Sequence, residues 1–191
     1  MPLGRPWRRG RPDPGKLLSS IEEIARIRVF RGVPRGELRA LLSMASTTQF
    51  PVDSVVLREG DLADDALLVL SGRLRASVRA GHRVRQLGSV RPGEVIGEGA
   101  LFMGRSRRNA TVTATEPSEC LLITRDLLIR GGPNAGLVAI EKHLLRVMSR
   151  RIRRTNKAIL ELWHGAQRDE DKGQRGPRLR DRIRGLFKEP R

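Results

Sequence analysis

The sequence contains little that would place the protein outside a reducing compartment or within a membrane. Its 191 residues include a single cysteine, Cys120, so an internal disulfide is excluded. No segment approaches the roughly 18 continuous apolar residues that span a bilayer. The N-terminus also lacks the apolar core of a signal peptide. We therefore expect a cytoplasmic protein.

The sequence also lacks the residue groupings of common enzymes. His82, His143 and His164 lie in unrelated contexts, without a neighbouring nucleophile or a metal-ligand spacing. One cysteine is too few to ligate an iron–sulfur cluster. We expect a protein that is not an enzyme and that uses no cofactor or metal.

Basic residues dominate the charge. The formal net charge is +17 and the isoelectric point is about 11.6. Residues 1–16 hold five basic and one acidic side chain, and residues 164–191 hold nine and five, so the two ends supply eight of the seventeen charges. This balance is consistent with nucleic acid or an anionic membrane as a weak partner of the tails. It is equally consistent with an arginine-rich genomic composition.

The hydrophobic pattern divides the chain into successive segments. Residues 1–15 are rich in proline, glycine and arginine and predict a disordered basic tail. Apolar residues at helical spacing then predict N-terminal helices within 16–46, the first ending near Phe30 and the second following a break at Gly32-Val33-Pro34.

Residues 47–130 predict strands. Short apolar segments alternate with turns that contain glycine or proline, which is typical of a barrel or jelly roll rather than of a parallel α/β sheet. The fold class expected is mainly β with helices, an eight-stranded jelly-roll β-barrel with N-terminal helices and a long C-terminal helix. The strand segments are Val55–Leu57, Leu67–Leu70, Leu74–Val78, Val84–Leu87, Val95–Ile96, Ala110–Ala114 and Cys120–Ile123.

The periodicity changes again after Gly131-Gly132-Pro133. Apolar residues at intervals of three and four predict a C-terminal helix over 134–163, about 40 Å long at 1.5 Å per residue. Its apolar stripe fits either a seam between two copies of the chain or a cover for the barrel. Residues 164–191 predict a basic linker and an amphipathic segment over Arg178–Lys188, suited to a membrane, a partner or solvent.

One stretch carries the candidate binding site. Gly97-Glu98-Gly99-Ala100-Leu101 offers a glycine turn and one carboxylate, and ten residues after Glu98 an arginine, Arg108, precedes a β-branched strand. Such a layout can hold a small anionic molecule that carries hydroxyl groups.

Four blocks in order resemble the cyclic nucleotide-binding domain, over about Phe30 to Trp163. They resemble the ligand-binding domain of the bacterial catabolite activator branch, without its DNA-binding domain. The blocks are Phe50–Asp61, Leu67–Leu74, Arg91–Glu98 and Arg108–Ala114.

This resemblance implies a phosphate-binding cassette. Arg108 would bind the cyclic phosphate and Glu98 the ribose 2′-hydroxyl, with Gly97 and the backbone N–H groups of Gly99, Ala100 and Leu101 close to the ligand. Asn109 stands where the family has a small or hydroxyl residue, beside Ala110 at the start of the strand. On the long helix, Thr155 and Asn156 match the pair that contacts the base, and Trp163 fits either base stacking or the core.

The function expected is that of a stand-alone receptor. The ligand would be cAMP, with cGMP as the alternative, and binding would shift the C-terminal helix and signal to an unknown protein partner. The 28 residues after Trp163 are too few and too polar for a helix-turn-helix domain. The alternatives are a scaffold that has lost the cAMP response, recognition of a cyclic dinucleotide, or nucleic-acid binding through the tails.

Overall fold

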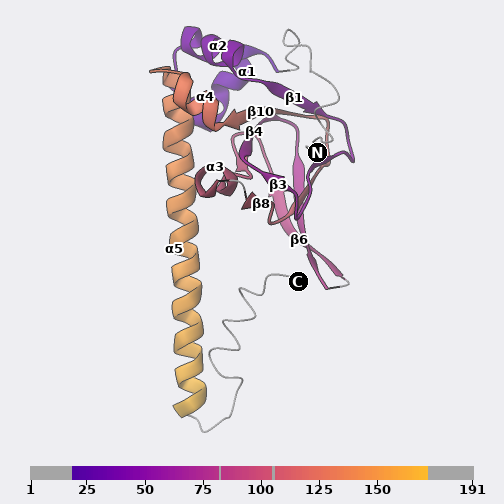
Figure 1. Ribbon diagram of the computed structural model, residues 1–191, viewed down its shortest axis with the longest axis vertical. Coiled ribbons are helices and arrows are strands. Elements are labelled where there is room, and N and C mark those ends of the chain that lie inside the picture. Colours follow the sequence, from indigo (N-terminus) through magenta and orange to yellow (C-terminus); the bar gives the residue numbers. More distant parts are fainter. Residues whose placement is uncertain (1–18, 82, 105, 172–191) are drawn as a thin grey trace. The chain divides into compact units, whose positions relative to one another are not determined.

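The computed structural model describes residues 19–81, 83–104 and 106–171 (Figure 1). The chain divides into two compact units, residues 1–144 and residues 145–191. The predicted basic tail at 1–15 and the amphipathic segment over Arg178–Lys188 lie outside the described residues.

Two helices and a 3₁₀ turn precede the sheets: α1 (Ile21–Arg26), η2 (Arg28–Phe30) and α2 (Arg35–Met44). Helix α1 begins at Ile21 because Ser20 caps it. The Ser20 hydroxyl accepts a hydrogen bond from the Glu23 N–H at 3.2 Å, and the Glu23 carboxylate accepts one from the Ser20 N–H at 2.8 Å. Ile27 is extended and ends the helix. The break at Gly32-Val33-Pro34 lies between η2 and α2, as predicted.

The strands form two four-stranded antiparallel sheets and one small pair. The helix-facing sheet has the order β1-β10-β4-β7 and the outer sheet the order β2-β9-β5-β6, while β3 pairs with β8. The bounds are β1 (Thr47–Phe50), β2 (Val55–Leu57), β3 (Leu62–Ala63), β4 (Asp65–Ser71), β5 (Leu74–Ala80), β6 (Arg83–Val90), β7 (Val95–Ile96), β8 (Ser106–Arg107), β9 (Thr111–Ala114) and β10 (Ser118–Thr124).

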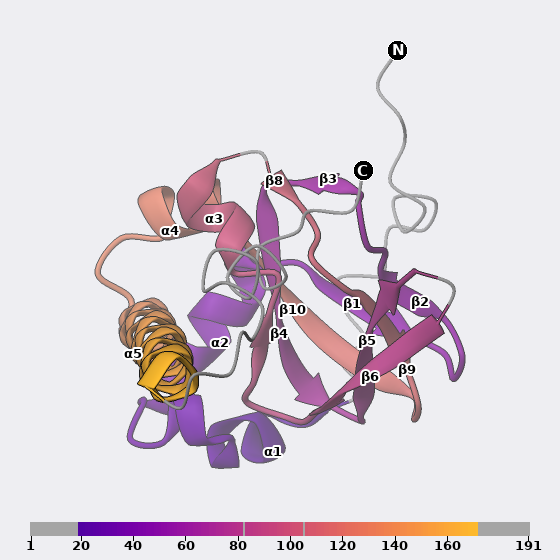
Figure 2. The ribbon, with the colours of Figure 1, turned by 90° about the horizontal axis from the view of Figure 1, so that it is seen from below.

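The central strands of the helix-facing sheet are buried on both faces. In β4, Ala66, Leu68 and Leu70 pack in the cluster that includes α1 and α2, whereas Leu67 and Val69 pack against the outer sheet. Figure 2 shows this sheet between the N-terminal helices and the outer sheet. Burial on both sides explains why the sequence of β4 is continuously apolar instead of alternating.

The expected mainly β fold with N-terminal helices and a long C-terminal helix is confirmed. In the described residues the two four-stranded sheets face each other and do not close into a barrel, so jelly roll describes the strand region only loosely. Each predicted strand segment overlaps a strand. Strands β1, β3 and β8 were not predicted, because they are short or polar.

The last helices are α4 (Arg125–Arg130) and α5 (Ala135–Asp171). Helix α5 continues eight residues past Trp163, into residues that the sequence predicts as a linker. Its first ten residues belong to the first unit, where Leu137, Ile140 and Leu144 pack in the core with α1 and α2. From Leu145 the helix belongs to the second unit.

Cys120 gives a test of the core. Its thiol is fully buried in β10, and burial, with a smaller contribution from Glu119, raises its pKa to about 12. A raised pKa keeps the thiol protonated at pH 8, and the thiolate is the reactive form. We expect no reaction of the folded chain with a thiol reagent at pH 8 and one equivalent in 6 M guanidinium. Fast labelling of the folded chain would contradict this packing.

Candidate functional site

The cassette begins at a turn that requires glycine. Strand β7 ends at Ile96, and Gly97 follows with φ of +74° before α3 (Gly99–Met103). A Cβ added to Gly97 would lie 2.1 Å from Nη1 of Arg108. The position is therefore doubly restricted, by its backbone angle and by the guanidinium that lies against it.

The backbone of Arg108 is held between the β2–β3 loop and β8. Its N–H donates to the Asp61 carbonyl at 2.9 Å, and its carbonyl accepts from the Gly60 N–H at 2.8 Å. These two bonds fix the direction in which the side chain leaves the loop.

The Arg108 side chain is buried, with 7% of its surface exposed. Nη1 donates to the Asp65 carbonyl at 2.7 Å and to the Gly97 carbonyl at 3.0 Å. Nη2 forms an ion pair with the Asp65 carboxylate. The guanidinium thus joins the start of β4 to the glycine turn, two segments more than thirty residues apart in the sequence.

Asp65 is the site residue that sequence reasoning missed. It follows Ala63-Asp64 and reads as part of a polar turn, yet it is 3% exposed and is the first residue of a strand that is otherwise apolar. Loss of either member of a buried carboxylate–guanidinium pair is costly, because the other charge stays buried without its counter-charge. Asp65 therefore positions Arg108 and supplies its counter-charge.

Glu98 and the start of α3 lie on the other side of the glycine turn. The Glu98 side chain is 3% exposed. The N–H of Ala100 donates to the Gly97 carbonyl at 3.2 Å, and the N–H of Leu101 donates to the Glu98 carbonyl at 3.1 Å. Two of the three N–H groups expected to contact an anion thus close the turn of α3 in this structure.

The neighbours of Arg108 differ from it in burial. Arg107 is exposed and donates from Nη1 to the Gly60 carbonyl at 2.8 Å. Asn109 is exposed and Ala110 is half-buried. The structure brings Arg108, and not Arg107, against Gly97.

Thr155 and Asn156 lie on α5 in the second unit, and both are exposed. Glu98 and Arg108 belong to the first unit. A role of Thr155 and Asn156 in reading the base stays a prediction, as does stacking by Trp163, which is 49% exposed.

Arg125, the first residue of α4, makes a further contact that the sequence did not indicate. Its Nε donates to the Leu101 carbonyl of α3 at 2.7 Å. Figure 2 shows α3 between α4 and the β3–β8 pair. The helix that follows the glycine turn is therefore tied to the helix that precedes α5.

Other kinds of site find no support in the part of the chain that the structure describes. No group of three His, Cys, Asp or Glu side chains there is arranged to hold a metal ion. No described helix has the length and apolar character needed to cross a bilayer.

Comparison with known proteins agrees with this geometry. The sequence model of the cyclic nucleotide-binding domain matches residues 47–130, from β1 to the end of α4. These residues resemble a cyclic nucleotide-binding domain. The matched residues include the glycine turn, Glu98, Arg108 and Asp65.

Relatives include two bacterial regulators and one solved domain. The CRP-like cAMP-activated global transcriptional regulator of Mycobacterium tuberculosis is 31% identical over 145 residues, 74% of this chain and 62% of the relative. The cyclic AMP receptor protein of Thermus thermophilus is 33% identical over 138 residues, which are 70% of this chain and 60% of that protein. A cyclic nucleotide-binding domain from Methylobacillus flagellatus superposes with a TM-score of 0.57 at 25% identity. The superposition covers 74% of this chain and 80% of that domain. The chain thus spans about three fifths of the two regulators.

The glycine turn yields a paired prediction. Replacing Gly97 by alanine places a methyl group on the Arg108 guanidinium at a positive φ, so we expect Gly97→Ala to weaken binding of a cyclic nucleotide by at least about ten-fold, or ~1.4 kcal/mol. Gly99 has no atom within 4 Å of an added Cβ, so Gly99→Ala is the matched control. Isothermal titration of both variants with cAMP tests this. Equal affinities would refute the assigned role of Gly97.

Proposed function

We propose that the protein is a non-enzymatic receptor for a cyclic mononucleotide, with cAMP as the preferred ligand and cGMP as the alternative. The observation that carries this proposal is the buried guanidinium of Arg108 against the glycine turn of a cyclic nucleotide-binding domain. The preference for cAMP is supported by the names of the two bacterial relatives. One buried free thiol is compatible with a cytoplasmic location.

Arg108 is suited to the phosphate. A cyclic phosphate carries one negative charge, and a guanidinium can meet two of its oxygens through paired charge-assisted hydrogen bonds. Because Asp65 and the Gly97 carbonyl already hold the guanidinium, the side chain does not need to be ordered when the ligand arrives. Pre-organisation of this kind raises affinity by reducing the entropy lost on binding.

Glu98 is suited to the sugar. A carboxylate accepts hydrogen bonds without donating any when ionised, which matches the ribose 2′-hydroxyl as a donor. Thr155 and Asn156 would read the base with one hydroxyl and one amide, a pair that accommodates adenine and does not exclude guanine.

Helix α5 would transmit the effect of ligand binding from the cassette to a partner. Arg125 ties the cassette helix α3 to α4, and Leu137, Ile140 and Leu144 of α5 share a core with Leu101 of α3. A change at the cassette therefore reaches packed side chains of α5 directly. We propose that the ligand shifts the population of α5 positions, and that a partner protein reads the change.

We further propose that α5 pairs with a second copy of the chain. In the second unit, six residues repeat at intervals of three and four, the spacing of a two-helix seam: Leu145, Met148, Ile152, Thr155, Ile159 and Leu162. Leu145 and Ile152 are 62% and 60% exposed, so this apolar stripe is available to a partner helix. Leu144, by contrast, belongs to the core of the first unit.

Nucleotide binding is tested by isothermal titration with cAMP, cGMP and a cyclic dinucleotide. Arg108→Ala should cost about 2–5 kcal/mol of binding free energy, at least about 30-fold in affinity. Arg107→Ala, which removes the exposed neighbour, is the matched control and should bind normally. Arg108→Lys keeps the positive charge beside Asp65, so some nucleotide binding should remain. The affinity should be lower than that of the wild type, because lysine cannot form the paired hydrogen bonds.

Circular dichroism must show that each variant is folded, because Arg108→Ala removes the ion pair with the buried Asp65. No heat from the folded wild type with either mononucleotide would refute the receptor and favour a scaffold. A response to the cyclic dinucleotide alone would assign a different ligand.

Pairing through α5 is tested by sedimentation over a range of concentrations. Ile152→Asp places a charge in the seam and should give monomers. Leu160 is also exposed, at 51%, but lies off the seam, so Leu160→Asp should remain dimeric. A monomeric wild type at all concentrations, or an equal effect of both substitutions, would rule out this seam.

A further inference from the structure

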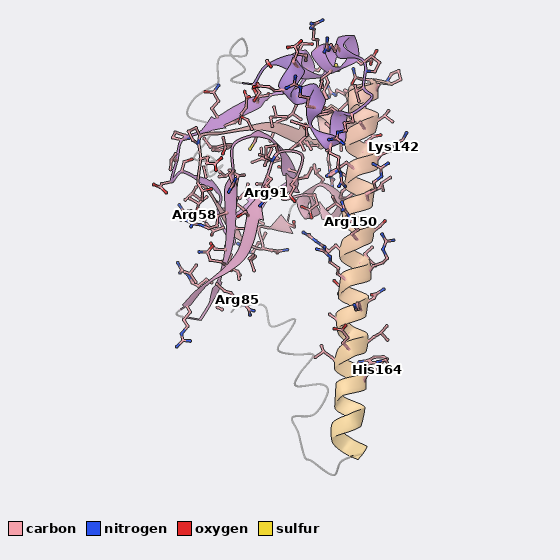
Figure 3. The ribbon with its side chains drawn as sticks, turned by 180° about the vertical axis from the view of Figure 1, so that it is seen from behind. Arg58, Arg85, Arg91, Lys142, Arg150 and His164 are labelled. Atoms are coloured by element: carbon pink, nitrogen blue, oxygen red, sulfur yellow. The ribbon has the colours of Figure 1, made fainter. Side chains whose placement is uncertain are left out.

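Helix α5 carries two opposite faces in the second unit. At 100° per residue, the apolar stripe from Leu145 to Leu162 is centred about 180° from a second set of side chains. That set, called the basic stripe here, consists of Arg146, Arg150, Arg153, Arg154 and Lys157. All five residues are exposed, and Figure 3 shows the side chains that project along this helix, with Arg150 labelled.

Little negative charge accompanies the basic stripe. Between Leu145 and His164 the sequence has six arginines and lysines and a single carboxylate, Glu161. Glu161 lies 3.8 Å from Lys157 in an exposed pair one helical turn apart, an arrangement worth only a few tenths of a kcal/mol. The basic stripe therefore carries a high density of positive charge that nearby carboxylates do not neutralise.

We propose that the basic stripe binds the sugar–phosphate backbone of double-stranded nucleic acid. From Arg146 to Lys157 the helix rises about 16 Å, which corresponds to roughly five phosphates along one strand at 3.4 Å each. Four of the five cations are arginines, whose planar guanidinium matches two phosphate oxygens. A straight row of cations fits a regular polyanion better than it fits isolated carboxylates.

The binding does not depend on base sequence. Arginine can also read guanine in the major groove, but this row of cations matches the spacing of successive phosphates along one strand, so we expect its contacts to be to phosphates. Such contacts position a protein on a duplex and make its affinity strongly dependent on salt.

The geometry disfavours a membrane as the partner of this face. The apolar stripe is a narrow seam with Thr155 within it, whereas a helix that lies in a membrane interface buries a broad apolar face. With that seam toward the lipid, the basic stripe would point into water about one helix diameter, ~10 Å, from the headgroups. At physiological salt this distance exceeds the screening length.

The test measures fluorescence anisotropy of a labelled 20-base-pair DNA of arbitrary sequence with the full chain, from 50 to 200 mM salt. The stripe variant carries Arg150→Gln, Arg153→Gln and Arg154→Gln, because glutamine has nearly the helix propensity of arginine. The control carries Arg75→Gln, Arg83→Gln and Arg85→Gln, three exposed arginines of the β5–β6 hairpin, of which Figure 3 labels Arg85. Both variants lose the same charge and keep both tails.

We expect the stripe variant to bind at least about ten-fold more weakly at 100 mM salt and the slope of log K against log salt to fall by about 1 for each lost contact. The hairpin variant should bind like the wild type. An unrelated duplex of the same length should bind equally well.

Three outcomes would overturn the proposal. These are equal weakening by both variants, undiminished binding by the stripe variant, and stronger competition by polyglutamate or by vesicles with 30% anionic lipid than by unlabelled DNA. Arg108→Ala should leave DNA binding unchanged. The inference therefore stands or fails separately from the proposed nucleotide receptor.

Discussion

The ion pair between Arg108 and Asp65 holds the candidate site together. It joins the loop after β8 to the first residue of β4, and through the Gly97 carbonyl it also fixes the turn that leads into α3. Burying two charges is costly unless they neutralise each other. The pair therefore constrains three segments at once and sets the position of the Arg108 guanidinium.

The surrounding sheets explain how this pair can be buried. Strand β4 has the N-terminal helices on one face and the outer sheet on the other, so Asp65 begins a strand that is shielded on both sides. The same sandwich connects the cassette to α5. Leu101 of α3 shares its cluster with Leu137 and Leu144, and Arg125 adds a polar tie between α3 and α4. The cassette and the start of α5 therefore belong to one packed body.

Much of this architecture could be predicted from the sequence, for identifiable reasons. The glycine turn and the arginine-containing segment before an apolar strand depend on neighbouring residues. The choice of Arg108 over Arg107 came from the family pattern, in which the arginine stands two residues before Ala110 and ten after Glu98. The start of α1 was not predicted. The apolar periodicity continues back to residues 17 and 18, whereas the Ser20–Glu23 cap begins the helix at Ile21.

What the sequence did not predict depends on contacts between distant segments. Asp65 lies 43 residues from Arg108, and an aspartate next to another aspartate is indistinguishable from a surface turn until the fold buries it. Strands β3 and β8 are two residues each and exist only through their mutual pairing. The apolar stripe of α5 looked continuous, yet Leu144 is in a core and Leu145 is 62% exposed.

The exposed side chains of the second unit restrict how its charge can be regulated. Guanidinium groups keep their proton far above physiological pH and are not substrates for lysine acetylation. Of the five cations in the basic stripe of α5, only Lys157 can be neutralised by acetylation. The field of this helix is therefore nearly constant in the cell, and changes in ionic strength or the approach of a competing anion are what can alter it.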